Sequence, residues 1–202
     1  MKLRVFRRLV ATLSITSVVA GVAIMGFAGF HIYQSHQMTG RSLLPSAERI
    51  WTKHRMQNIN SLTDPVPGSF IGTISIPSVG KSVNIFQGTD NSELAKGVGH
   101  FIQSVMPGMA DNSVLAGHRD TVFSHLGRVK IGATILITTE SGKFTYRVDK
   151  IRIVDKNDRT VIVPTTTAQL TLSTCYPFIY IGSAPKRYIV IARLVTRSHI
   201  AT

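Results

Sequence analysis

The sequence predicts an all-β domain, a sandwich or a closed barrel with few helices, preceded by a transmembrane helix. Eight short segments rich in β-branched and aromatic residues follow one another over about 130 residues, and Gly, Pro, Asn or Asp separates most of them. Among them, only DNSELAKGV (90–98) has a clear helical pattern. The chain of 202 residues is long enough for one such domain with attachments.

The first predicted element is a transmembrane signal-anchor over residues 9–33. No charged residue occurs from Leu9 to Phe30, and at about 1.5 Å per helical residue this run crosses a bilayer core of roughly 30 Å. Four basic residues precede the run: Lys2, Arg4, Arg7 and Arg8. They are expected to keep residues 1–8 in the cytoplasm and to place the rest outside the cell membrane. The alternative, a cleaved signal peptide, usually has a shorter apolar centre and a small-x-small cleavage site.

The second predicted element is a stalk or linker over residues 34–67 that contains a short helix. The stretch SAERIWTKHRMQNI (46–59) has Ser46 as a suitable N-cap and an amphipathic pattern. The prolines and glycine of SLTDPVPG end this helix and mark a domain boundary. The β-rich domain is therefore expected to cover residues 68–196, and residues 197–202 form a C-terminal tail.

The predicted strands of this domain are short and are bounded by turn residues. They are FIGTISIP (70–77), SVNIF (82–86), SVLAG (113–117), ATILIT (133–138), FTYRVDKIRIV (144–154), TVIVP (160–164), QLTLSTC (169–175) and RYIVIARLV (187–195).

The charge of the chain points to an anionic envelope or membrane surface. The formal net charge is +13, and without the four basic residues of the topology signal 19 Lys and Arg remain against 10 acidic residues, about +9. No basic run interleaved with aromatic residues occurs, so we predict no nucleic-acid partner. We predict no metal site, because a solvated turn explains Asp155 and Asp158 better. We also predict no cofactor, and the sequence says nothing about calcium dependence.

Cys175 is the only cysteine and lies in TLSTCYPF (171–178). A lone cysteine is often a small buried hydrophobe. Outside the cytoplasm, however, an unpaired thiol is open to oxidation, and Tyr176 and Pro177 place this one at a strand end, on the rim of a sheet. A thiol with a reference pKa of about 8.5 needs a nearby cation or base to act as a nucleophile.

Arg187 is the predicted neighbour of Cys175. The connection between segments 169–175 and 187–195 suits an antiparallel return, in which the last residue of the first strand faces the first residue of the second at about 5 Å. A guanidinium carries a permanent charge and a planar fork of donors, which suits a carbonyl oxygen or the oxyanion that develops on it.

A histidine would complete the set as a proton carrier for a leaving amine. His118 directly follows the apolar segment 113–117, so it also lies at a strand end, and we prefer it. His100 and His125 stay open as alternatives, although their settings are more typical of turn or packing residues. The other histidines lie outside the β-rich domain: His31, His36, His54 and His199.

Three stretches resemble, in order and spacing, the His, Cys and Arg motifs of the sortases, which are cell-wall transpeptidases of Gram-positive bacteria. They are NSVLAGHRDTVF (112–123), TLSTCYPF (171–178) and APKRYIV (184–190). HRDT and YPF make the resemblance greatest to class D. It implies an eight-stranded sortase-like β-barrel with one or two short helices, Cys175 as the nucleophile, His118 as general acid and base, and Arg187 as the group that stabilises the oxyanion.

The resemblance also implies substrates and substrate contacts. Surface proteins with a C-terminal LPxTG-like signal form a thioester with the enzyme, and an amine of a peptidoglycan precursor or another wall component resolves it. Thr174 resembles a position that assists the oxyanion, although a purely structural role on a strand explains it as well. Val161 and Val163 could accept the apolar residues of the signal, but we expect two residues of the set Val161, Ile162 and Val163 to be core.

Other classes of protein fit parts of this pattern. An L,D-transpeptidase normally has its cysteine in an SxGC setting, which STCYPF replaces here, and a papain-like peptidase has its cysteine before its histidine. A pilin-polymerising sortase usually has a second, C-terminal span and an Asp-Pro-aromatic lid, whereas Val66 follows Asp64 and Pro65. A non-catalytic membrane-anchored β-domain with a structural cysteine is the remaining alternative, and in it Cys175→Ala would cost stability or nothing.

Overall fold

The computed structural model describes residues 17, 19–27, 29–30 and 65–198. The described residues before position 31 are helical, and their side chains are exposed. No helix among the described residues combines the length and the hydropathy that a membrane span requires. Most of the predicted anchor (9–33) and nearly all of the linker (34–67) lie outside the described residues, so both stay predictions.

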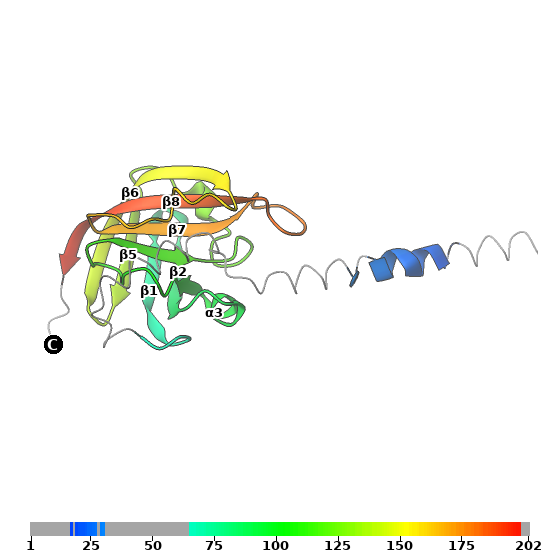
Figure 1. Ribbon diagram of the computed structural model, residues 1–202, viewed down its shortest axis with the longest axis horizontal. Helices are drawn as coiled ribbons and strands as arrows, with labels where there is room; N and C mark the ends of the chain where they lie inside the picture. Colours follow the sequence, from blue (N-terminus) through cyan, green and yellow to red (C-terminus); the bar gives the residue numbers. More distant parts are fainter. Residues whose placement is uncertain (1–16, 18, 28, 31–64, 199–202) are drawn as a thin grey trace, which may run out of the picture. The chain divides into compact units, whose positions relative to one another are not determined.

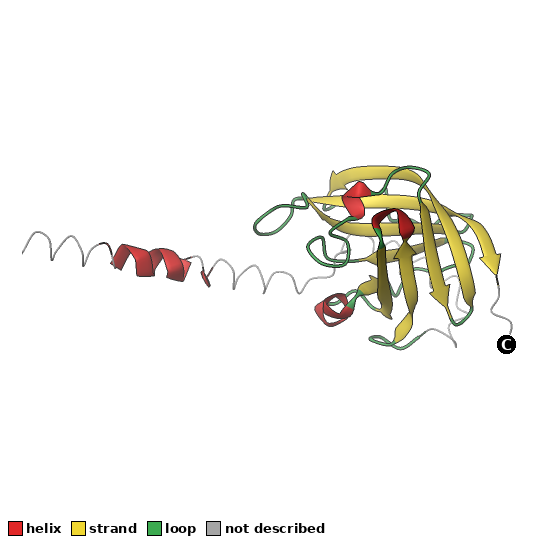
Figure 2. Cartoon of the chain, turned by 180° about the vertical axis from the view of Figure 1, so that it is seen from behind, coloured by secondary structure: helices red, strands yellow, loops and turns green. Residues whose placement is uncertain are grey.

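Residues 65–198 form a closed eight-stranded β-barrel with few helices (Figures 1 and 2). The strands follow one another around the barrel in the order β1-β2-β3-β4-β7-β8-β6-β5. The pairs β2–β3 and β4–β7 are parallel, and the other neighbours are antiparallel. Closure pairs every strand on both sides and so removes the open edges of a sheet.

The strands are β1 (Phe70–Ile76), β2 (Lys81–Gln87), β3 (Val98–His100), β4 (Asn112–Ala116), β5 (Thr134–Thr139), β6 (Gly142–Asp155), β7 (Gln169–Tyr176) and β8 (Lys186–Ser198). The helices of the barrel domain are α3 (Asn91–Lys96) and two 3-10 turns, η2 (Pro77–Val79) and η3 (Leu126–Arg128).

Seven of the eight predicted strands are present, and the helical segment 90–98 contains α3. The predicted strand at 160–164 is wrong, because this segment is irregular. Its apolar residues Val161 and Ile162 are buried from a loop, and the Val163 carbonyl accepts a side-chain bond from Asn112 (2.9 Å) in place of a strand partner. A short apolar run does not by itself distinguish a strand from another buried segment.

Strand β3 was not predicted, because it has three residues and is flanked and interrupted by glycine. Both glycines are required by close backbone approach. A Cβ on Gly97 would lie 2.5 Å from the Asn84 carbonyl oxygen, and one on Gly99 would lie 2.3 Å from that of Gly88. Glycine has a low strand propensity. The close backbone contacts that require glycine here therefore also remove the sequence pattern by which β3 could be predicted.

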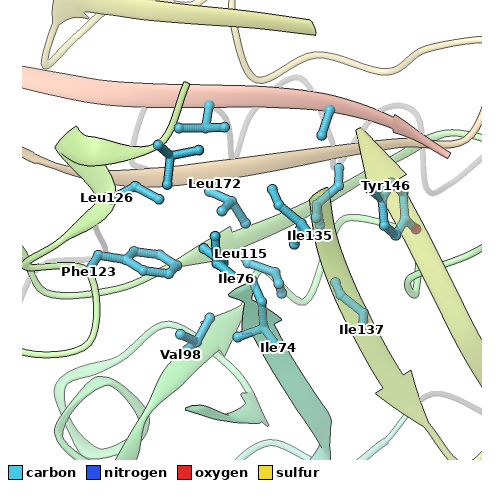
Figure 3. Packing of buried hydrophobic residues seen from close by; sticks show 14 of the residues in the cluster. Ile74, Ile76, Val98, Leu115, Phe123, Leu126, Ile135, Ile137, Tyr146 and Leu172 are labelled. Atoms are coloured by element: carbon cyan, nitrogen blue, oxygen red, sulfur yellow. The ribbon is translucent and has the colours of Figure 1, made fainter. Parts of the chain in front are cut away.

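Two clusters of buried side chains cover the two faces of the barrel wall. The larger contains Leu115 of β4 and Leu172 of β7 (Figure 3). It also contains Val190 of the neighbouring strand β8. The smaller contains residues of the opposite parity on β4 and β8, including Ala116 and Ile189. Successive side chains on a strand point to opposite faces, so these three strands are covered on both sides.

Candidate active site

Cys175 is the next-to-last residue of β7, the strand that lies between β4 and β8. Its thiol is free and its side chain is partly exposed. The five residues before it, Leu170 to Thr174, are fully buried, with exposed fractions of 0%. The cysteine therefore occupies the point at which a core strand reaches the rim of the barrel, as the sequence predicted.

Arg187 is the Cα partner of Cys175 in the antiparallel ladder between β7 and β8, which confirms the predicted juxtaposition. Its Nη1 donates to the carbonyl oxygens of Lys186 (3.0 Å) and Ala184 (3.2 Å). Its Nε–H is buried and has no hydrogen-bond partner within the described part of the chain. The residue paired with Cys175 thus has a guanidinium N–H without an acceptor, which suits a group that binds a substrate oxygen.

His118 lies on the other side of Cys175, just beyond the end of β4. In the parallel ladder Ala116 pairs with Ser173, and the Gly117 N–H donates to the Ser173 carbonyl (3.1 Å). The register therefore brings the turn that contains His118 to the end of β7. His118 itself is half-buried.

Side-chain parity places the Cys175 and Arg187 side chains on one face of the wall. Cys175 packs against the smaller buried cluster, to which Ala116 and Ile189 belong. Residues two positions apart on a strand share a face, so Arg187 shares the face of Ile189 and therefore that of Cys175. Sulfur, imidazole and guanidinium thus come from three neighbouring strand ends, with the nucleophile in the middle.

Thr174 is fully buried, and its Oγ1 donates to the Gly117 carbonyl (2.7 Å). This bond uses the hydroxyl proton that direct assistance to an oxyanion would require. It ties the strand of Cys175 to the residue before His118, so the side chain of Thr174 holds two parts of the site together.

The predicted substrate contacts differ in their exposure. Val161 and Ile162 are buried in the smaller cluster, with exposed fractions of 4% and 6%, which confirms that two residues of the set are core. Val163 is half-buried. A Thr165 N–H bond to the Asp111 carboxylate (2.6 Å) fixes this segment. Substrate contact by Val161 or Val163 stays a prediction, and Val161 has little surface to offer.

The other two histidines have ordinary structural settings. His100 is 1% exposed, and its ring nitrogens bond with Gln87 Oε1 (2.7 Å) and the Val105 carbonyl (2.9 Å). His125 Nδ1 bonds with the neighbouring Ser124 hydroxyl (2.9 Å) at the start of η3. His100 is the packing residue that its sequence setting indicated.

An aromatic cluster at the ends of β7 and β8, on the face of the larger cluster, was not predicted. Tyr176, Phe178 and Tyr188 lie with ring centroids 5.1 to 6.1 Å apart, and burial, followed by the neighbouring Tyr176, raises the pKa of Tyr188. A Cβ on Gly127 would lie 2.6 Å from the Phe178 ring, so η3 packs directly on this cluster. The sequence contains a signal for this cluster, because aromatic residues directly follow Cys175 and Arg187 in YPF (176–178) and RY (187–188).

The acidic residues of the β6–β7 segment bond to their own turn. Asp155 Oδ1 accepts from the Asn157 N–H (2.8 Å), and Asp158 Oδ1 accepts from both the N–H and the hydroxyl of Thr160 (2.7 Å each). The Thr160 bonds lower the pKa of Asp158. Among the described residues, no group of three or more His, Cys, Asp or Glu side chains could hold a metal ion.

Comparisons with known proteins match the chain and its barrel to one family. The sortase domain family model matches residues 74–195. Sortase D of Bacillus subtilis (strain 168) is 35% identical over 189 residues, which cover 89% of this chain and 96% of that protein. The solved catalytic domain of B. anthracis SrtD is 40% identical with a TM-score of 0.59, and the match covers 70% of this chain and 98% of that one.

A second solved structure, Listeria monocytogenes sortase A, has a TM-score of 0.60 at 26% identity, over 66% of this chain and 92% of that one. The matched family model covers more than half of the chain, and the two solved structures share its fold. The chain therefore belongs to the sortase family of cysteine transpeptidases, and it is most like class D.

Proposed function

We propose that this chain cleaves an LPxTG-like sorting signal and transfers the resulting acyl group to a cell-wall amine, with Cys175, His118 and Arg187 as its catalytic residues. One observation carries the proposal: the Cα pairing of Cys175 with Arg187, while the parallel β4–β7 register brings the His118 turn to the other side of the same strand end. A nucleophile between a base and an oxyanion donor is the arrangement that acyl transfer needs.

In the first half of the reaction the Cys175 thiolate attacks the carbonyl carbon of the threonine in the signal. The carbonyl becomes a tetrahedral oxyanion, which the Arg187 guanidinium stabilises through N–H donors such as Nε–H. The C–N bond to the next residue then breaks, and His118 donates a proton to the departing amine. A thioester joins Cys175 to the substrate.

The second half reverses these roles. An amino group of a peptidoglycan precursor or another wall component attacks the thioester carbonyl and gives a proton to His118. The C–S bond breaks, the Cys175 thiolate is restored, and a new amide joins the surface protein to the wall. No redox change occurs, so these three side chains and the acceptor amine account for every bond and proton.

The proposed location follows from the N-terminal sequence. Residues 9–33 anchor the chain in the cell membrane as a single span, with residues 1–8 inside, and residues 34–67 link the span to a catalytic domain at 68–196 outside the cell. The excess of basic residues in the exported part suits an anionic envelope. The partners at that place are sorting-signal proteins and the amine acceptor.

A library of quenched LPxTG-like pentapeptides, supplied with and without a small amine acceptor, tests this proposal. We expect the wild-type chain to cleave one family of peptides and to form the amide product when the amine is present. Cys175→Ala and His118→Ala are expected to remove turnover while the thermal unfolding midpoint stays close to the wild-type value.

His100→Ala is the control for the histidine assignment. Its buried bonds predict a less stable barrel, so its activity is compared per mole of folded protein. Full activity in Cys175→Ala would refute the proposal. Full activity in His118→Ala together with none in folded His100→Ala would refute the choice of base.

A further inference from the structure

Arg119, the residue after His118, links the His118 turn to the loop that follows Cys175. Its Nη2 donates to the carbonyl oxygens of Tyr180 (2.7 Å) and Gly182 (3.3 Å). The guanidinium carbon also lies 5.8 Å from the centroid of the Tyr180 ring, a cation–π distance. One side chain therefore makes three contacts to a segment about 60 residues away in the sequence.

The loop that Arg119 contacts has little other support. Ile179 and Ile181 are 97% and 99% exposed, and Tyr180 is 46% exposed, so the tip of the connection between β7 and β8 has almost no apolar packing. Segments with few buried contacts open most easily. The bonds to Arg119 are thus the main restraint that the described residues place on this tip.

We propose that Arg119 is a positioning residue that fixes His118 relative to Cys175 and keeps the β7–β8 loop in place beside the thiol. The inference rests on the proposed function, because it concerns the same site. Arg119 adjoins His118 in the chain, and the loop it binds begins at the end of β7, directly after Cys175 and Tyr176. A bond between these two segments restrains the base and the nucleophile together.

The unsatisfied Nη1 of Arg119 argues against a purely stabilising role. This nitrogen is buried and has no hydrogen-bond partner within the described part of the chain. A buried donor without an acceptor costs stability, so a residue present only for stability would gain nothing from it. The planar guanidinium of Arg119 also combines these two carbonyl bonds with a cation–π contact to Tyr180, a combination that the compact ammonium of lysine does not reproduce.

The test uses the full-length chain in detergent and the pentapeptide that the wild type cleaves best. We expect Arg119→Ala to lower kcat about tenfold to a hundredfold, because displacement of a catalytic group by about 1 Å has an effect of this size, while KM changes by less than about threefold. Arg119→Lys keeps the charge and an ammonium with three N–H donors but loses the planar group over Tyr180, so it is expected to fall between Arg119→Ala and wild type. Arg147→Ala, which removes an exposed arginine from the middle of β6, is the charge-matched control.

Amide hydrogen exchange of residues 178–182 supplies a second measurement that does not depend on turnover. We expect exchange there to accelerate in Arg119→Ala and to stay unchanged in Arg147→Ala. Faster exchange with a wild-type kcat would overturn the proposal, because it would make Arg119 a merely structural restraint. Unchanged exchange would overturn it as well, because the loop would then be held without Arg119.

The two proposals fail in different ways. If the proposed function is wrong, the wild-type chain cleaves no pentapeptide in a Cys175-dependent manner, so there is no wild-type kcat with which to compare the Arg119 variants. If only the role of Arg119 is wrong, wild type turns over through Cys175, and Arg119→Ala either matches Arg147→Ala in kcat or shows unchanged exchange of residues 178–182.

Discussion

Strand β7 and the loop that follows it differ sharply although they are continuous in the chain. The strand residues Leu170 to Thr174 are fully buried, whereas the loop tip carries two isoleucines, Ile179 and Ile181, that are almost fully exposed. Cys175 lies at the boundary. The paired strand thus fixes the register of Cys175, whereas the loop directly after it is exposed to solvent.

The largest expected effect is on the free energy of unfolding, from a substitution in the buried part of β7. Leu172→Ala removes a 0% exposed side chain from the larger cluster (Figure 3), and we expect it to lower the free energy of unfolding by about 3 to 5 kcal/mol. Chemical denaturation of the barrel domain measures the change. A loss below about 1 kcal/mol would show that this part of β7 is not the rigid support that we describe.

A large effect on rate, with little effect on stability, is expected at the boundary itself. Arg187→Lys keeps a positive charge but loses the planar fork, so we expect kcat/KM to fall by about a hundredfold or more. The unfolding midpoint should change little, because Arg187 is only half-buried. Normal turnover in this variant would contradict the role assigned to the guanidinium.

A smaller effect on stability is expected at high pH, from the buried residue Tyr146. Burial raises the pKa of Tyr146 from 10.0 to about 12, while its phenol oxygen accepts a bond from the Gly108 N–H (2.7 Å). Because the folded state holds this proton more tightly, the stabilisation is complete below pH 10 and is lost as the pH rises towards 12. By pH 11 the loss amounts to about 1 kcal/mol.

Denaturation of wild type and Tyr146→Phe between pH 9 and pH 11 isolates this contribution. The variant is expected to be less stable at pH 9, because Gly108 loses its acceptor, and to lose less stability above pH 10. Parallel curves for the two proteins would contradict the account of a buried, proton-retaining phenol.

The smallest effect is expected at the loop tip. Ile181→Ser replaces a 99% exposed side chain, so the free energy of unfolding should stay within about 0.5 kcal/mol of wild type. This variant is the counterpart of Leu172→Ala, since both shorten an aliphatic residue on either side of Cys175. A loss comparable with that of Leu172→Ala would mean that the loop is packed.

Most of the barrel strands and the pairing of Cys175 with Arg187 could be predicted from the sequence, because both depend on residues near one another in the chain. Alternating apolar residues marked seven strands, and an antiparallel return fixes the register of Cys175 against Arg187 by the two strand ends alone. His118 could be preferred but not placed, because its position depends on the parallel β4–β7 pairing. Parallel partners lie far apart in the chain, so no local pattern specifies them.

The remaining features depend on contacts that leave no periodic signal. The segment at 160–164 has the composition of a strand, yet it packs as a loop because its backbone groups bond to side chains such as that of Asn112. Arg119 was passed over because its partners are backbone carbonyls of a distant loop. Every residue has a backbone carbonyl, so the residue types at Tyr180 and Gly182 do not indicate that Arg119 binds there.

Intact mass spectrometry of the chain during turnover of a cleavable pentapeptide shows directly whether Cys175 carries the acyl group. We expect a transient adduct equal to the acyl part of the peptide, mapped to Cys175, absent in Cys175→Ala, and removed faster when an amine acceptor is added. Peptide cleavage with no adduct on Cys175, or an adduct that persists in Cys175→Ala, would contradict this expectation.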